Sequence, residues 1–452
     1  MRISSRSLPA RPTRPPRAAI IASALAIHLL LSPACGDPDD DDPRVAWLAE
    51  HAIPISSLEP TDDDFSDLEP LASLIGDARV VMLGEQSHGD GTTFVAKTRL
   101  IAFLHQRMGF DVLAFESGIY DMRHAWDLIR SSTPAHQAMR QGVFDIWMGS
   151  AEMRPLSDYI DATWSGETPL ELAGVDIQFS GPASGTPVVA DLQAFLEGVG
   201  SPLLLDAGWA GFAAQLERLG NQEWYNDLPE AAELDSFAGF LSALMDELTA
   251  LAEQRPDDRE LAYWRQVLPS IQLTAQRFEL AEQGVSPREL GDIRDRAMGE
   301  NLIWLARERY PERRIIVWAA TRHTARNIHL VDGSPYEIDY SDVVTLGQVA
   351  HDALGSELYS LAFTAASGSL GIWWRDPEVL PPLPEDSFED LATRAGLRHA
   401  IVDFRDIAAG GEWLREPLVV RLLGHGDMTG RWTEVVDSVF FLETMAPATA
   451  SE

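Results

Sequence analysis

Cysteine, lysine and positive charge are scarce in this chain. Its 452 residues include one cysteine, Cys35, and one lysine, Lys97. A single cysteine excludes an intramolecular disulfide and a zinc site built from thiolates. The 35 basic residues face 70 acidic ones, and the net charge of −35 argues against nucleic acid or an anionic membrane surface as a partner. With 45% hydrophobic residues, the chain is long and apolar enough to bury a full core, in one large domain or two moderate ones.

The N-terminus has the composition of an export signal. Five arginines precede the apolar run Ala18–Leu31, which is short for a membrane span and typical of a signal-peptide core. A small residue stands before Cys35, as in a bacterial lipobox, and an acidic stretch follows. We predict a signal peptide over 1–34 and a location in the cell envelope, with membrane contact only through acylated Cys35. The alternative is ordinary secretion with a free thiol. Removing residues 1–34, with five Arg and no acid, changes the net charge from −35 to −40.

The pattern beyond this leader predicts an acidic tether and lead-in over 35–70 and one domain over 71–452. Its fold class is α/β, a mostly parallel sheet with flanking helices. The predicted strands are 78–83, 111–115, 170–175, 314–320, 358–365, 400–404 and 438–442. The predicted helices are 92–108, 120–130, 153–164, 188–196, 231–252, 258–280 and 287–309. Residues 187–310 contain no convincing strand, which predicts a helical insertion or lid over the C-terminal ends of the strands.

The first predicted strand–helix–strand unit carries the strongest candidates for chemistry. Its two strands end near Glu85 and Glu116, the turn between them holds His88, and the following helix holds Lys97. In α/β proteins the carboxyl ends of parallel strands are where chemistry gathers. We therefore expect acids at two adjacent strand ends, with His88 as a general base that a nearby carboxylate orients. For Lys97 a surface position is an equal alternative.

Two further segments offer ligand-contacting side chains. Asp176 lies at the end of the third predicted strand, where it either touches a ligand or locks a loop. Trp147 and Glu152 follow a short aromatic stretch that predicts an apolar wall with one acid, although aromatics at such spacing are more often core.

A cation and a second histidine come later in the chain. Arg294 opens a predicted helix, from which its guanidinium either clamps an anion or forms a structural salt bridge. His323 stands just beyond an apolar strand, so that it and His88 form a candidate pair for activating water and protonating a leaving group. No serine-nucleophile elbow, phosphate-binding loop, zincin helix or dinucleotide fingerprint occurs in a suitable context.

Four ordered motifs resemble the erythromycin esterase family: Leu-Gly-Glu-x-x-His-Gly from Leu83, Gly-Phe-x-x-x-x-Phe-Glu ending at Glu116, Gly-x-Asp-x-Gln over 174–178, and Val-Trp-Ala…His over 317–323. The resemblance implies an α/β core with a helical portion over a cleft. It also implies metal-independent hydrolysis of a macrolide lactone ester, an antibiotic-inactivating reaction. The resemblance makes His88 the base and Glu85, Glu116, Arg294 and His323 its partners.

Two positions depart from the macrolide-inactivating members that the chain resembles. Those members have arginine where Lys97 stands, and a histidine where this chain has Ala320. The chain is therefore similar to a divergent branch of the family rather than to those members.

Three hypotheses follow for the function. The first is an extracytoplasmic hydrolase of a small-molecule ester or lactone that needs no cofactor. In it His88 and Glu85 activate water, Glu116 balances charge, and Arg294, Lys97 and His323 stabilise the oxyanion. The second is a metal-dependent hydrolase that holds zinc or manganese with the same His and Glu side chains. The third is a non-catalytic lipoprotein that binds a small ligand in the same cleft.

Overall fold

The computed structural model describes residues 41–182, 184–333 and 339–451. The predicted signal peptide and Cys35 lie outside the described residues. Across those three ranges, no helix combines the length and apolar character needed to cross a membrane.

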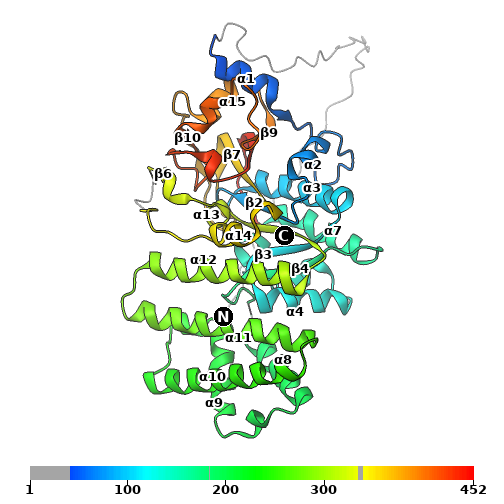
Figure 1. The fold of residues 1–452 in the computed structure, drawn as a ribbon, viewed down its shortest axis with the longest axis vertical. Coiled ribbons are helices and arrows are strands. Elements are labelled where there is room, and N and C mark those ends of the chain that lie inside the picture. Colours follow the sequence, from blue (N-terminus) through cyan, green and yellow to red (C-terminus); the bar gives the residue numbers. More distant parts are fainter. Residues whose placement is uncertain (1–40, 183, 334–338, 452) are drawn as a thin grey trace, which may run out of the picture.

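A nine-stranded sheet forms the centre of the described chain (Figure 1). Its spatial order is β1 (Ile53–Pro54), β9 (His399–Asp403), β12 (Ser438–Met445), β7 (Leu358–Leu370), β2 (Val80–Glu85), β5 (Arg314–Ala320), β3 (Phe110–Gly118) and β4 (Glu171–Asp176), with β8 (Glu378–Val379) on β7. The six strands from β12 to β4 run parallel, whereas β1, β9 and β8 pair antiparallel with their neighbours. A second small sheet contains β10 (Leu418–Val420), β11 (Met428–Gly430) and β6 (Val331–Asp332). The prediction of a mostly parallel sheet in an α/β fold is confirmed.

Both faces of the parallel strands are buried, as expected for strands covered by helices on either side. Along β2, Val81 and Leu83 join one hydrophobic cluster while Val80 and Met82 join another, because side chains alternate between faces. The first face is covered by α2 (Glu69–Ile75), α3 (Gly91–Met108) and α7 (Arg154–Trp164).

The second face is covered by the helical insertion and by α14 (Leu346–Leu354). The insertion consists of α8 (Gly185–Val199), α9 (Trp209–Gly220), α10 (Ala231–Gln254), α11 (Arg259–Glu282) and α12 (Pro287–Trp304), with no strand in its described part. In Figure 1, α12 lies beside the sheet and the other four helices stack beyond it. Helix α12 therefore lies between the sheet and the rest of the insertion, and its Arg294 reaches Glu116 and Asp176 at the ends of β3 and β4.

The remaining helices are α4 (Ile119–Arg130), α5 (Ala135–Met139) and α6 (Asp145–Met148) near β3 and β4, α13 (Thr321–Thr324) after β5, and α1 (Pro43–His51) with α15 (Phe388–Arg394) beside β9.

The strand order corrects one expectation about the first unit. β2 and β3 are not adjacent, because β5 pairs with both and lies between them. Glu85 is the last residue of β2, whereas β3 continues two residues past Glu116. The segment after β5 is consequently flanked by the two strands that carry Glu85 and Glu116.

Candidate active site

Glu85 and His88 form a hydrogen-bonded dyad at the end of β2. The Glu85 side chain is fully buried, and its Oε1 lies 3.1 Å from Nδ1 of His88 and accepts from Trp147 Nε1 at 2.6 Å. Its other oxygen accepts from Nζ of Lys97. The Lys97 ammonium also lies 4.4 Å from the centre of the Trp318 ring. These contacts fix Glu85 as a charged group that orients His88 through one ring nitrogen.

The loop that carries His88 is held by contacts on both sides. A Cβ added to Gly89 would lie 2.5 Å from the carbonyl carbon of Gly371, so only glycine fits this close backbone approach. Asp90 accepts from the Ser87 backbone N–H at 2.8 Å, and its other oxygen lies 2.8 Å from Nε2 of His425. The backbone around His88 is therefore tied to two distant segments of the chain.

Glu116 forms the centre of a second charged group. One of its oxygens accepts from Arg294 at 2.9 Å and lies 3.2 Å from Nε2 of His323, while the other accepts from the Ala320 backbone N–H at 3.0 Å. Burial alone would raise the pKa of Glu116, but the charges of His323 and Arg294 outweigh it and hold that pKa well below its ordinary value. Arg294 is also bidentate to Asp176, with Nε 3.0 Å from Oδ1 and Nη2 2.5 Å from Oδ2. Arg294 is thus fixed by carboxylates from two strand ends.

His323 is held between two carboxylates. Its Nδ1 lies 2.6 Å from Oδ1 of Asp295, opposite the Glu116 contact of its Nε2. Burial opposes the charged form of the ring, yet Asp295 and Glu116 raise the pKa of His323 to about 9. At neutral pH the ring is therefore an imidazolium, which can donate a proton but cannot accept one.

Asp295 is a site residue that sequence reasoning missed. It is fully buried, and it also accepts from the Leu346 backbone N–H at 3.1 Å and from Arg322 at 3.2 Å. In the sequence, the one feature that pointed to Asp295 was its position directly after Arg294. Successive residues of a helix point about 100° apart, so this adjacency gave no reason to expect both side chains in one site.

A cavity of about 760 Å³ opens between these two groups. Its lining includes His88, Glu116, Trp147, Arg294 and His323. The structure thus brings five of the predicted site residues to one cavity, with Glu85 and Asp176 directly behind them.

Besides Glu85 and Asp176, two predicted residues do not line this cavity. Lys97 lies behind Glu85 with no exposed surface, so its ammonium contacts that carboxylate and is not placed to reach an oxyanion. Glu152 lies elsewhere and accepts from the backbone N–H and the hydroxyl of Thr449, at 3.0 and 2.6 Å.

Charges balance within the two groups centred on Glu85 and Glu116. Four carboxylates face four cations, and the acids are Glu85, Glu116, Asp176 and Asp295. The cations are Lys97, Arg294, Arg322 and protonated His323. This set is electrically neutral without any charge on His88.

A comparison of the sequence with models of protein families determines the family of this chain. The model of the family described as erythromycin esterase matches residues 105–444, three-quarters of the chain. The protein belongs to the erythromycin esterase family. It is accordingly a hydrolase of ester bonds, as the resemblance in the motifs predicted.

The relatives of this family member are distant. The chain is 25% identical over 429 residues to a proposed hydrolase, YbfO, from Bacillus subtilis (strain 168), covering 89% of this chain and 91% of that one. It is 22% identical over 391 residues to the erythromycin esterase type II of Escherichia coli, covering 80% and 88% of the two chains. A solved structure of a mutant erythromycin esterase, EreC, in its open conformation superposes with a TM-score of 0.67 at 18% identity, covering 86% of this chain and 97% of that one. This last likeness establishes the shared fold.

Proposed function

We propose that this esterase hydrolyses an ester or lactone of a small molecule, using water that His88 activates and no metal ion. The observation that carries the proposal is the Glu85–His88 dyad on one wall of a 760 Å³ cavity, with the Arg294–His323–Glu116 group on another. A base and a set of cations on one cavity are what addition of water to an ester carbonyl requires.

His88 acts as the base in this proposal. Glu85 accepts the proton on Nδ1, which leaves Nε2 with a lone pair, and no described residue hydrogen-bonds Nε2. The ring takes a proton from water as that water attacks the ester carbonyl carbon. The imidazolium formed on His88 is stabilised by buried Glu85, and it returns the proton to the leaving oxygen when the carbon–oxygen bond breaks.

Arg294 and His323 supply positive charge for the oxyanion. Both line the cavity, and both are held in place by carboxylates behind them rather than by solvent. Donors fixed in this way need little reorganisation when negative charge develops, which is the main source of electrostatic stabilisation of a transition state. Glu116 keeps both cations in position and offsets their mutual repulsion.

The contacts of the two glutamates support a metal-free reaction over a metal-dependent one. Glu85 is bonded to Lys97, and Glu116 to Arg294 and His323, so cations of the protein hold the positions that a zinc or manganese ion would need. Within the described ranges, no three His, Cys, Asp or Glu side chains are grouped to hold an ion.

The proposed location is the cell envelope, with a lipid on Cys35. The support is the arginine-rich leader, its apolar core and the small residue before Cys35. Labelling cells that express the full chain with a radioactive fatty acid tests this. We expect label in the wild type and none in Cys35→Ser; equal labelling of the two would contradict it.

Hydrolysis of a panel of esters and lactones, macrolides included, tests the reaction. The purified protein is assayed beside His88→Ala and beside His136→Ala, a histidine outside both charged groups, each with and without a chelator. We expect turnover in the wild type and in His136→Ala that the chelator leaves unchanged, and its loss in His88→Ala. Loss of turnover with chelator and recovery with one metal would select the metal-dependent reaction instead.

A further inference from the structure

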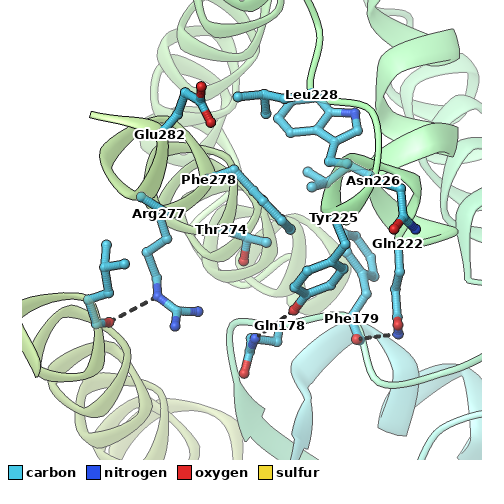
Figure 2. A pocket seen from close by; sticks show the side chains of 14 residues that line it. Gln178, Phe179, Gln222, Tyr225, Asn226, Leu228, Thr274, Arg277, Phe278 and Glu282 are labelled. Atoms are coloured by element: carbon cyan, nitrogen blue, oxygen red, sulfur yellow. Dashed lines mark hydrogen bonds between the residues drawn. The ribbon is translucent and has the colours of Figure 1, made fainter. Parts of the chain in front are cut away.

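A second cavity, of about 460 Å³, lies within the helical insertion (Figure 2). Helix α11 contributes Arg277 and Phe278 to its wall, and the short 3₁₀ turn after α9 contributes Trp224 and Tyr225. The loop after β4 closes one side with Gln178. The wall is therefore mostly apolar, with four aromatic rings, and it carries one guanidinium, Arg277, and one carboxylate, Glu282.

This second cavity adjoins the active-site cavity. Gln222 lines both of them, and its Nε2 donates to the Phe179 carbonyl at 3.1 Å. The backbone of Gln222 has a φ of 61°, a left-handed conformation that is uncommon for a residue with a side chain. On the same side, the backbone N–H of Gln178 donates to Asp176, the carboxylate that holds Arg294. A ligand extending from the active site past Gln222 would enter the second cavity.

The aromatic wall is built to receive an apolar group. Phe278 meets Tyr225 edge-on with ring centres 4.8 Å apart, and Trp224 packs against Phe278 at 6.0 Å. Tyr225 nevertheless remains 61% exposed. An exposed aromatic ring beside a concave apolar surface is typical of a ligand-binding wall.

Arg277 supplies a charge that no acidic side chain of the described residues contacts. Its Nε donates to the Leu290 carbonyl at 3.0 Å, and no described residue hydrogen-bonds its two terminal nitrogens. Burial lowers the pKa of Arg277, and the nearby charge of Arg294 lowers it further. Asp176, whose charge acts in the opposite direction, is bonded to Arg294. An external anion would stabilise this partly desolvated guanidinium strongly, because the guanidinium can bind it through two parallel hydrogen bonds.

The positively and the negatively charged side chain of the cavity lie toward opposite ends of it. Figure 2 shows the guanidinium of Arg277 directed toward Gln178, and Glu282 near the other end of the cavity. Gln178 donates to the Tyr225 hydroxyl at 3.2 Å, which leaves the hydroxyl proton free to donate to a ligand. Donors thus gather around one end of an aromatic chamber.

We propose that the second cavity binds an apolar group, aromatic or aliphatic, that carries one negative charge, such as a carboxylate or sulfonate, with the anion on Arg277 and the Tyr225 hydroxyl. This inference deepens the proposed function and rests on it in one respect: the group is the part of the ester substrate that is remote from the bond cleaved. The preferred substrates are then esters with an anionic, apolar substituent.

Binding of two fluorescent probes tests the cavity without any reaction. 8-Anilinonaphthalene-1-sulfonate carries the anion, and N-phenyl-1-naphthylamine is its neutral counterpart. We expect Arg277→Gln to weaken binding of the sulfonate by about tenfold or more and to leave the neutral probe unchanged. Arg265→Gln, at an exposed position on the same helix, is the matched control and should change neither. Ala281→Trp, which fills the cavity from an exposed position, should weaken both probes. Equal sulfonate affinity in wild type and Arg277→Gln would overturn the inference.

Two esters of matched length test the link to the substrate. 4-Nitrophenyl hydrogen adipate carries a terminal carboxylate, and 4-nitrophenyl hexanoate lacks it. We expect Arg277→Gln to raise KM for the anionic ester by about tenfold while leaving its kcat and both constants of the neutral ester unchanged. Equal KM shifts for both esters would refute the substrate assignment. If neither ester is cleaved but the probes behave as expected, the proposed hydrolysis of such esters fails and the anion specificity of the cavity stands.

Discussion

The pairing of Asp295 with His323 predicts a shift in the alkaline limb of the pH–rate profile. Asp295 is one of two carboxylates that raise the pKa of His323 to about 9. An opposite charge in direct contact shifts a pKa by about 1–3 units, so Asp295→Asn should lower this pKa to roughly 7.5. The asparagine keeps the size of the side chain and a hydrogen-bond acceptor, and it removes only the charge.

The loss of turnover in Asp295→Asn should depend on pH in a way that identifies the titration of His323 as its cause. At pH 8.5 a ring with a pKa near 9 is about three-quarters protonated, whereas one with a pKa near 7.5 is about one-tenth protonated. The turnover that depends on the imidazolium should therefore fall about eightfold in Asp295→Asn at pH 8.5. At pH 6.5 both proteins keep nearly all of the imidazolium, so their turnover should be similar.

The assay is the pH dependence of kcat for the best ester of the panel, from pH 6 to 10. Asp292→Asn is the matched control, since Asp292 lies on the same helix and has no contact with His323. The wild type and this control should lose activity as the pH rises through about 9. If Asp295→Asn keeps the wild-type alkaline limb, His323 does not act as an imidazolium held by Asp295, and the reasoning is wrong.

The same raised pKa has a consequence for stability. Because the folded pKa of His323 lies above the ordinary 6.5, the stabilisation is complete below pH 6.5 and is lost as the pH rises through about 9. Urea unfolding of the wild type should thus give a lower free energy of unfolding at pH 9.5 than at pH 6.5, and Asp295→Asn should show a smaller difference. Equal differences in the two proteins would contradict this account.

Three other substitutions test separate parts of the site. Lys97→Met should lower the free energy of unfolding by about 3 kcal/mol in urea titrations, because it leaves Glu85 buried beside no cation; adding Glu85→Gln should restore stability but not turnover. Arg294→Lys should lower kcat/KM by about 10²-fold, since an ammonium cannot reproduce the bidentate contact that orients the charge. Gly89→Ala should lower kcat more than it changes KM, because the added Cβ displaces the His88 loop from Gly371.

Each of these three predictions has an outcome that would contradict it. A Lys97→Met protein as stable as the wild type would mean that Glu85 is not held as an anion by that lysine. A wild-type kcat/KM in Arg294→Lys would show that the guanidinium is not needed to stabilise the oxyanion. An unchanged kcat in Gly89→Ala would show that the geometry of the loop is not critical for His88 as the base.

The strands could be predicted from sequence because their signal is local. The predicted 314–320 coincides with β5, and the apolar runs near Glu85 and Glu116 became β2 and β3 within a few residues. The order of the strands could not be predicted, since β5 enters between β2 and β3 from about 200 residues later in the chain. Pairing at that separation is decided by packing of whole layers and not by any short pattern.

The site shows the same division between local and distant information. Glu85, Glu116 and Asp176 were found because a carboxylate at the end of an apolar run is locally recognisable. Asp295 and Gln222 were not, since each acts through a contact with a distant segment, His323 in one case and Phe179 in the other. Lys97 was found as a candidate, but its burial behind Glu85 depends on the packing of α3 and could not be read from its position.

Chemical rescue of His88→Ala is the most direct test of the central claim, that His88 is the base of a metal-free ester hydrolysis. The rate of the variant on the best ester is measured in the presence of chelator, with and without added imidazole, beside the wild type. We predict a loss of about 10²–10⁴-fold and a partial recovery that rises with imidazole concentration, because the ring removed lines an open cavity that imidazole can enter. A variant that turns over at the wild-type rate, or a wild type that chelator inactivates, would contradict the account.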